Sequence, residues 1–151
     1  MNFHCISIKI EGMKATKTSL LEAKIEATAG ETAVEQPTST SMIRFFGSTP
    51  DGVNPRGFAT RISGSFVPDT DGTHVVGVVS TGPFTLAADD VTIVEDPEME
   101  LPRSEEFFGY GSVEVTAEIE CTAGVPVTLS IQWATAEANG FAALRIGIRS
   151  P

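Results

Sequence analysis

Acidic side chains are the commonest groups in this sequence that could take part in catalysis or bind a metal ion. Hydrolysis of a glycosidic bond needs two carboxylic acids that face each other across a pocket. Because Asp and Glu are also favoured in solvated turns, adjacent acidic residues do not by themselves predict an enzyme. Four candidate pairs fall in stretches that we interpret as turns or loops: Asp69/Asp71, Asp89/Asp90, Glu95/Asp96 and Glu105/Glu106.

Nucleophilic and metal-assisted chemistry has little support in the sequence. A serine or cysteine nucleophile requires a histidine base beside it, and the two histidines, His4 and His74, lie in expected strands with no G-x-S-x-G motif. Cys5 and Cys121 lack zinc or redox spacing, and we expect two free core thiols, with a disulfide as the alternative. The sequence therefore predicts no catalytic residue, no metal ligand and no cofactor.

Aromatic side chains interrupt the strand pattern in the stretch "EEFFGYGS", residues 105–112. Neighbouring side chains in an extended segment point in opposite directions, so we expect one ring to fill the end of the core while another faces outward. Loops on a rigid β scaffold commonly carry binding residues, and a flat aromatic face suits the apolar face of a sugar ring. Phe107, Phe108 and Tyr110 are therefore the candidate substrate-binding residues.

Short β-strands are expected to position these residues. Residues 113–119 and 125–133 alternate between apolar and polar side chains, and the turn sequence between them, 122–124, favours a hairpin with one face on the core. The expected core residues of the second strand are Val127, Leu129, Ile131 and Trp133.

The middle of the chain, residues 57–96, is expected to form four strands that fold back on one another at turns rich in Asp, Gly and Pro. The second of these strands is apolar on both faces, as in a strand buried on both sides. The expected strands are 61–67, 73–80, 84–88 and 91–95.

The first part of the chain is less regular. Residues 3–10 and 42–46 are expected strands, and residues 30–41 an expected loop. Residues 20–27 fit both a short helix and a strand, and the β-rich surroundings favour the strand. The chain thus predicts a single all-β domain over residues 1–151, an antiparallel sandwich or barrel of about nine to eleven short strands.

Composition limits the partners of the domain. The net charge of −10 disfavours nucleic acid and anionic membrane surfaces, which attract basic patches. With 41% hydrophobic and 20% charged residues, the chain is expected to be globular. It has no apolar run long enough to span a bilayer and no visible signal peptide, which slightly favours a cytoplasmic location.

Motifs along the chain resemble, in their order, the β-barrel domain named after the protective antigen of a bacterial toxin. Copies of that domain are inserted in family 3 glycoside hydrolases, the β-glucosidases. The resemblance is good over residues 42–151 and loose before them. The motifs are "GSFVPDTDGT" (64–73), "STGPFTL" (80–86), "DDVTIVED" (89–96), "EEFFGYGSVEV" (105–115), "TAGVPVTLSIQW" (122–133) and "LRIGIRSP" (144–151).

This resemblance implies an accessory domain that has no activity alone, because no match to the nucleophile motif of the family 3 enzymes is found in this sequence. Its implied partners are a β-linked oligosaccharide and the catalytic domains of the parent glycosidase. The resemblance also implies a lid at the aglycone side of the active-site pocket, to which Phe107, Phe108 and Tyr110 would contribute. The alternatives are a freestanding, lectin-like carbohydrate-binding module and a structural spacer.

The same resemblance bears on calcium. Some yeast adhesin relatives hold calcium and sugar with two consecutive aspartates in a loop after a central strand. The matching position here is Ser80-Thr81-Gly82, which has no carboxylate. Adjacent aspartates such as Asp89-Asp90 supply few of the oxygen ligands that calcium requires, so we expect no calcium site.

Overall fold

The computed structural model of the chain describes residues 3–9, 19–27, 35–38, 42–46, 49, 51, 53, 57–136 and 141–151. One sheet contains β1 (Phe3–Lys9), β2 (Glu35–Thr38), β4 (Ala59–Phe66), β6 (Phe84–Ala88), β7 (Val91–Asp96) and β9 (Val127–Ala134). The other contains β3 (Met42–Phe46), β5 (Gly72–Ser80), β8 (Val115–Cys121) and β10 (Phe141–Arg149). The described residues also include two helical segments, α1 (Leu20–Ala27) and the 3-10 segment η1 (Glu106–Gly109).

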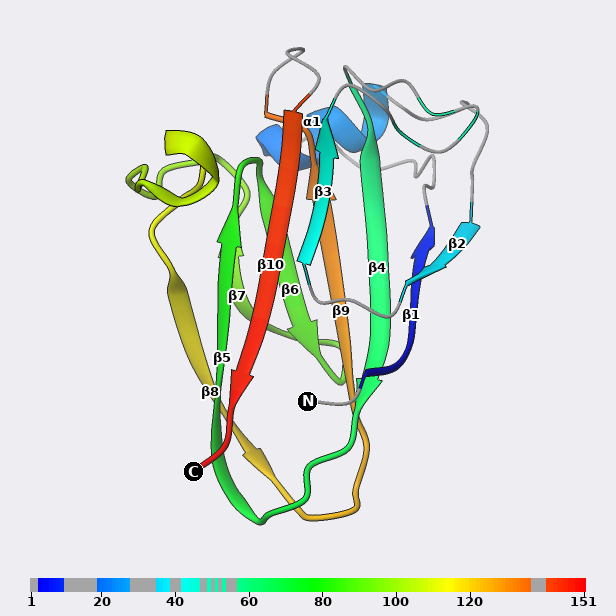
Figure 1. Ribbon diagram of the computed structural model, residues 1–151, viewed down its shortest axis with the longest axis vertical. Helices are drawn as coiled ribbons and strands as arrows, with labels where there is room; N and C mark the ends of the chain where they lie inside the picture. Colours follow the sequence, from blue (N-terminus) through cyan, green and yellow to red (C-terminus); the bar gives the residue numbers. More distant parts are fainter. Residues whose placement is uncertain are drawn as a thin grey trace.

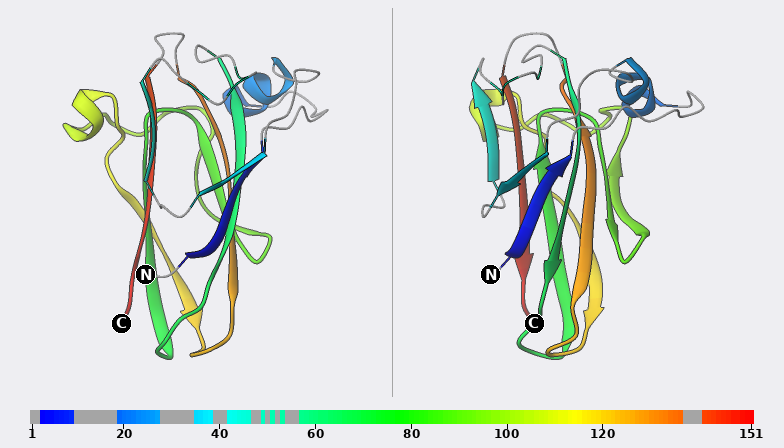
Figure 2. Two further views of the ribbon diagram at one scale, coloured as in Figure 1. Left: turned by 45° about the vertical axis from the view of Figure 1, so that its right-hand side comes forward. Right: turned by 90° about the vertical axis from the view of Figure 1, so that its right-hand side faces the viewer.

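The two sheets pack face to face as a sandwich (Figure 1). The six-stranded sheet has the order β2-β1-β4-β9-β6-β7 and the four-stranded sheet the order β3-β10-β5-β8. Every described strand pair is antiparallel. The predicted all-β antiparallel fold is confirmed, in its sandwich form. Figure 2 shows α1 and η1 at the same end of the sandwich, on opposite outer sides.

The core lies between the sheets and is built from the inward side of each strand. Part of it is an aromatic group, the core aromatic cluster, made of the buried Phe58 and Trp133 and the half-buried Phe45. The Trp133 ring is fully buried, stacks 6.4 Å from the ring of Phe45 and meets the ring of Phe58 edge-on at 5.7 Å. The predicted burial of four alternating residues of β9 is confirmed for Val127, Leu129, Ile131 and Trp133.

The predicted hairpin between β8 and β9 is wrong. β8 pairs with β5 in the four-stranded sheet, whereas β9 pairs with β4 and β6 in the six-stranded sheet. The connection between them therefore crosses from one sheet to the other. Alternation identifies the side of a strand that faces the core, but it is the same for two strands that pair and for two strands that face each other across the core.

The middle strands show the same effect. Residues 59–96 do form four strands, but only β6 and β7 pair with each other. The connections from β4 to β5 and from β5 to β6 both cross between the sheets. β5 is largely buried in its second half, in agreement with the apolar character of both its faces.

The predicted strand over residues 20–27 is also wrong, because this segment is the helix α1. The Ser19 hydroxyl accepts a hydrogen bond from the backbone N–H of Glu22 (3.1 Å), which caps the first turn. Leu21 and Ile25 are one helical turn apart, so both lie on the same face and pack with Ala59 and Ala134 on the six-stranded sheet.

The predicted loop over residues 30–41 contains the short strand β2, which pairs with β1. Its Pro37 is tolerated because β2 lies at the edge of the sheet, where one side of the strand needs no partner. Neither helical segment in the described part of the chain has the length and apolar character that a bilayer crossing demands.

Candidate functional site

Four of the eight candidate carboxylates, those of Asp71, Asp89, Asp96 and Glu106, accept hydrogen bonds within the chain. Asp71 Oδ1 accepts a hydrogen bond from Ala123 N (2.8 Å), and Asp89 Oδ1 accepts one from Thr128 N (2.9 Å). The buried carboxylate of Asp96 accepts bonds from two backbone N–H groups that follow it, at 2.7 and 3.3 Å. Within the described ranges, no group of three or more His, Cys, Asp or Glu is placed to hold a metal ion.

His74 and Cys121 are buried near the start of β5 and the end of β8. His74 Nδ1 lies 3.1 Å from Gly72 O, and the imidazole meets the Phe66 ring edge-on at 5.6 Å. Cys121 is a free thiol, as predicted, while the side chain of Cys5 lies outside the described residues. Burial, followed by the charges of Glu120 and Asp89, raises the pKa of the Cys121 thiol. A thiol that stays protonated is a poor nucleophile.

The aromatic stretch forms a compact turn, so the predicted extended geometry is wrong. Phe107 (φ 51°, ψ 49°) and Phe108 (φ 60°, ψ 31°) are both left-handed, a conformation that is unfavourable for bulky residues. No residue of η1 is buried, so neither phenylalanine fills the end of the core. Instead, Phe107 is partly exposed, and 77% of the Phe108 surface is accessible.

Hydrogen bonds and a tight backbone approach hold η1 in this shape. Gly111 N donates to Glu106 O at 2.9 Å, and Tyr110 N donates to Phe107 O at 3.2 Å. A Cβ atom on Gly111 would lie 2.8 Å from Glu106 O, so this position requires glycine. The Arg145 guanidinium of β10 donates two bonds to the Glu106 carboxylate, at 3.2 and 3.3 Å. This two-pronged pairing ties the turn to the four-stranded sheet.

Arg103 forms a second support for the turn. Its Nη1 donates to Tyr110 O (3.2 Å) and Ser80 O (3.4 Å), and its Nη2 donates to Leu101 O (2.9 Å). The Asp96 carboxylate lies 3.8 Å from the same Nη2. A single side chain therefore connects the end of β5 with the segment after β7 and the segment after η1.

Phe108 and Tyr110 meet two further rings that the sequence reasoning missed, Phe46 and Phe141. We call these four residues the exposed aromatic cluster. Neighbouring ring centroids are 5.0–6.3 Å apart, and Phe46 and Tyr110 are 60% and 53% exposed. Phe46 stands directly opposite Phe141 in the register of β3 and β10. The adjacent pair Phe45-Phe46 could have indicated an exposed ring from the sequence, because one of two neighbouring rings in a strand faces outward.

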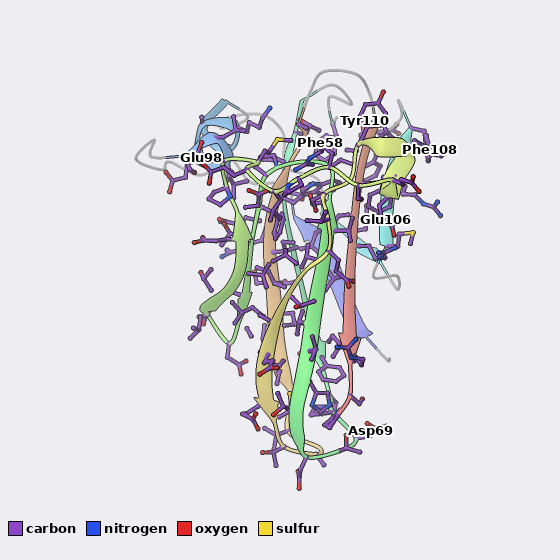
Figure 3. All side chains as sticks on the ribbon, turned by 90° about the vertical axis from the view of Figure 1, so that its left-hand side faces the viewer. Phe58, Asp69, Glu98, Glu106, Phe108 and Tyr110 are labelled. Carbon is purple, nitrogen blue, oxygen red and sulfur yellow. The ribbon has the colours of Figure 1, made fainter. Side chains whose placement is uncertain are left out.

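A pocket of about 200 Å³ lies beside this cluster. Figure 3 shows Phe108 and Tyr110 at the η1 end of the sandwich, with Asp69 at the opposite end. Tyr110 and Phe141 belong both to the cluster and to the pocket wall. The other lining residues are Thr81, Met99, Arg103, Gly109 and Ala136.

The sequence and the fold of this chain are similar to those of known proteins. The PA14 domain family model matches residues 12–151. "Probable beta-glucosidase H" of Aspergillus clavatus is 24% identical over 111 residues, which are 74% of this chain and 13% of that protein. The chain thus spans a small part of this relative.

Solved structures share the fold. A β-glucosidase from Kluyveromyces marxianus has a TM-score of 0.75 at 16% identity, over 97% of this chain and 16% of that chain. A PA14 sugar-binding domain from an RTX adhesin has a TM-score of 0.52 at 14% identity, over 96% of this chain and 89% of that chain.

Proposed function

The chain belongs to the PA14 domain family, and from this membership we propose that it is an accessory domain of a family 3 β-glucosidase. In this proposal the exposed aromatic cluster contacts the aglycone, the part of the substrate beyond the glucose residue that is cleaved. The catalytic carboxylates would belong to other domains of the same protein, which are the proposed partners of this chain. The proposed ligand is a β-linked oligosaccharide.

The observation that carries this proposal is the backbone of Phe107 and Phe108. Two consecutive phenylalanines in the left-handed region are costly, on the order of 1–3 kcal/mol each. The outcome of this geometry is a ring that is mostly accessible to solvent and buries little apolar surface. A strained backbone that presents an exposed ring is expected where the ring meets a ligand. Contact with the ligand can offset the free-energy cost of the strain, which the small apolar burial of the ring does not offset in the folded domain.

The chemistry of such a contact is non-covalent. The rings of the exposed aromatic cluster can pack against the C–H groups on one face of a pyranose ring, which is apolar. A contact of this kind acts on substrate and transition state alike, so it changes KM while leaving kcat unaltered. The domain would therefore select which substrates bind well, and it would leave the cleavage step to its partner domains.

A mutation in the full-length protein that carries this domain tests the proposal. Phe108→Ala should raise KM for cellobiose several-fold, or about 1 kcal/mol for one lost ring contact, at unchanged kcat. The KM for 4-nitrophenyl β-glucoside should change less, because its aglycone is a single ring rather than a second sugar. Val125→Ala is the matched control, since Val125 is a large apolar residue with 53% exposure outside the cluster. An unchanged KM for cellobiose in Phe108→Ala would refute the aglycone role.

A freestanding sugar-binding module is the second candidate. The likeness to the sugar-binding domain of an RTX adhesin, of which 89% is covered, favours it, because that domain is similar in extent to this chain. The two candidates differ in the natural reading frame, which is several times longer for an insert and near the present length for a freestanding module. A pure spacer is less well supported, since it would have no use for the three exposed rings of Phe46, Phe108 and Tyr110.

A further inference from the structure

The pocket beside the exposed aromatic cluster has polar groups that are already hydrogen-bonded within the chain. Thr81 is 4% exposed, and its hydroxyl both donates to Ala143 O (3.3 Å) and accepts from Ala143 N (3.0 Å). The hydroxyl thus acts as a link to β10. It has its donor and one acceptor position in use before any ligand enters.

The Arg103 guanidinium is likewise hydrogen-bonded within the chain. Three carbonyl oxygens and the Asp96 carboxylate surround its two terminal nitrogens at 2.9–3.8 Å. The three carbonyl oxygens occupy three of the four terminal N–H groups of the guanidinium, and the Asp96 carboxylate stands at ion-pair distance from the same end. Arg103 therefore supports the pocket as a structural brace, and it has few donors left for the hydroxyl groups of a ligand.

The remaining lining side chains in the described part of the chain are aromatic or apolar. Tyr110 and Phe141 contribute rings with centroids 5.9 Å apart, and Met99 and Ala136 contribute a thioether and a methyl group. Among the described lining side chains, the Tyr110 hydroxyl is the one polar group for which no bond within the chain is seen. Such a lining favours a ligand that presents an apolar ring and at most one or two polar substituents.

We propose that this pocket binds a planar aromatic ring, namely the phenolic aglycone of an aryl glycoside. A pyranose carries several hydroxyl groups, each of which loses water on burial and needs a replacement partner, and the described lining side chains supply too few. An aromatic ring needs none and can pack on Tyr110 and Phe141. The volume agrees, because an apolar cavity of about 150 Å³ is large enough to hold benzene.

This inference extends the proposed function and rests on it for the link to a glycoside. The two surfaces would then divide the aglycone side between them. A second sugar would lie on the exposed face around Phe108, and an aryl group would enter the pocket between Tyr110 and Phe141. Binding of a free phenolic ring, however, can be tested on the 151-residue chain alone.

The chain offers two natural reporters for this test, since it contains one tyrosine and one tryptophan. Tyr110 lines the pocket, and Trp133 is fully buried in the core. In an NMR titration with 4-methylumbelliferone, the Tyr110 ring resonances should shift in a saturable way while the Trp133 indole resonances stay in place. Cellobiose at the same concentrations should shift the Tyr110 resonances less and without saturation.

Three variants locate the binding, which is followed through the fluorescence of 4-methylumbelliferone. Tyr110→Ala should weaken its binding by about tenfold, through loss of one ring contact, whereas Tyr110→Phe should retain it within about threefold, since the ring remains. Ala136→Leu should also weaken binding, because the larger side chain fills the pocket. Tyr110 is an exposed residue, so its variants keep the test decisive even where Ala136→Leu does not fold.

The outcomes separate the inference from the proposed function. No saturable shift with 4-methylumbelliferone, a cellobiose affinity equal to or above that of the phenol, or full binding in Tyr110→Ala would each overturn the inference. In all three cases the proposed function would still stand if Phe108→Ala in the full-length protein raises KM for cellobiose several-fold. Failure of Phe108→Ala to change KM would refute the proposed function, whatever the phenol does.

Discussion

Phe45 and Phe46 are neighbours in β3, yet they belong to two different aromatic groups. Phe45 points inward to the core aromatic cluster, where it stacks on the buried Trp133. Phe46 points outward to the exposed aromatic cluster, where it meets Phe108 and Phe141. The residue type is the same on both sides of one sheet. Only the inner rings remove large apolar surfaces from water, so only they are needed for the fold.

This difference separates the rings that the fold requires from the rings that it does not require. An exposed ring contributes little to the free energy of unfolding, so its presence calls for another explanation, above all where the backbone beneath it is strained. The following substitutions test the distinction, from the largest expected effect on stability to the smallest.

Removal of the buried Trp133 ring should have the largest effect on the free energy of unfolding. Trp133→Ala should lower the free energy of unfolding by about 3–5 kcal/mol, because it leaves a cavity at a fully buried position. Urea denaturation followed by far-ultraviolet circular dichroism measures this loss. A cost below about 1 kcal/mol, within the range of ordinary surface substitutions, would show that the core aromatic cluster is not part of the stable core.

The turn that carries Phe108 should be more tolerant, because it lies outside the core. Gly111→Ala places a Cβ atom 2.8 Å from Glu106 O, so the turn must open, at an expected cost of roughly 1–3 kcal/mol. The damage should be local. NMR resonances of Tyr110 should shift while those of Trp133 stay unchanged, and equal shifts in both would mean that the turn and the core are coupled.

The ion pair between Glu106 and Arg145 should contribute least to stability. Both side chains are partly exposed, at 45% and 32%, and surface pairs are typically worth 1 kcal/mol or less. Arg145→Lys, which keeps the charge but loses the two-pronged geometry, should therefore leave the melting temperature nearly unchanged. Its effect should be on KM for cellobiose, through looser positioning of Phe108, and should resemble a mild form of Phe108→Ala. A large fall in melting temperature would instead assign the pair to the fold.

The sequence was a better guide to the core cluster than to the exposed one. Strict alternation in residues 125–133 identifies the inward side chains of β9, because solvent and core impose it residue by residue. It does not identify strand partners, and for this reason the expected hairpin of β8 and β9 differs from the observed pairing. Partner choice depends on contacts between distant segments, which a local pattern does not encode.

The exposed cluster is harder to predict for two physical reasons. Phe46 and Phe141 are far apart in the sequence and meet only through the register of β3 and β10. The left-handed backbone of Phe107 and Phe108 opposes local preference, so a rule based on favourable conformations predicts an extended segment instead. The stretch 105–112 interrupts the strand pattern in the sequence, but its shape comes from the contacts that Arg103, Arg145 and Gly111 make around it.

The comparison between Phe45 and Phe46 provides the most direct test of this account. Both should be replaced by alanine in the full-length protein, and both the free energy of unfolding and KM for cellobiose should be measured. Because Phe45 is half-buried against the core, we expect Phe45→Ala to lose about 2 kcal/mol of stability, less than a fully buried ring would. Phe46→Ala should change stability by no more than about 0.5 kcal/mol while it raises KM several-fold. If Phe46→Ala leaves KM unchanged, or destabilises the protein as much as Phe45→Ala does, then the exposed rings do not serve binding and the central claim is wrong.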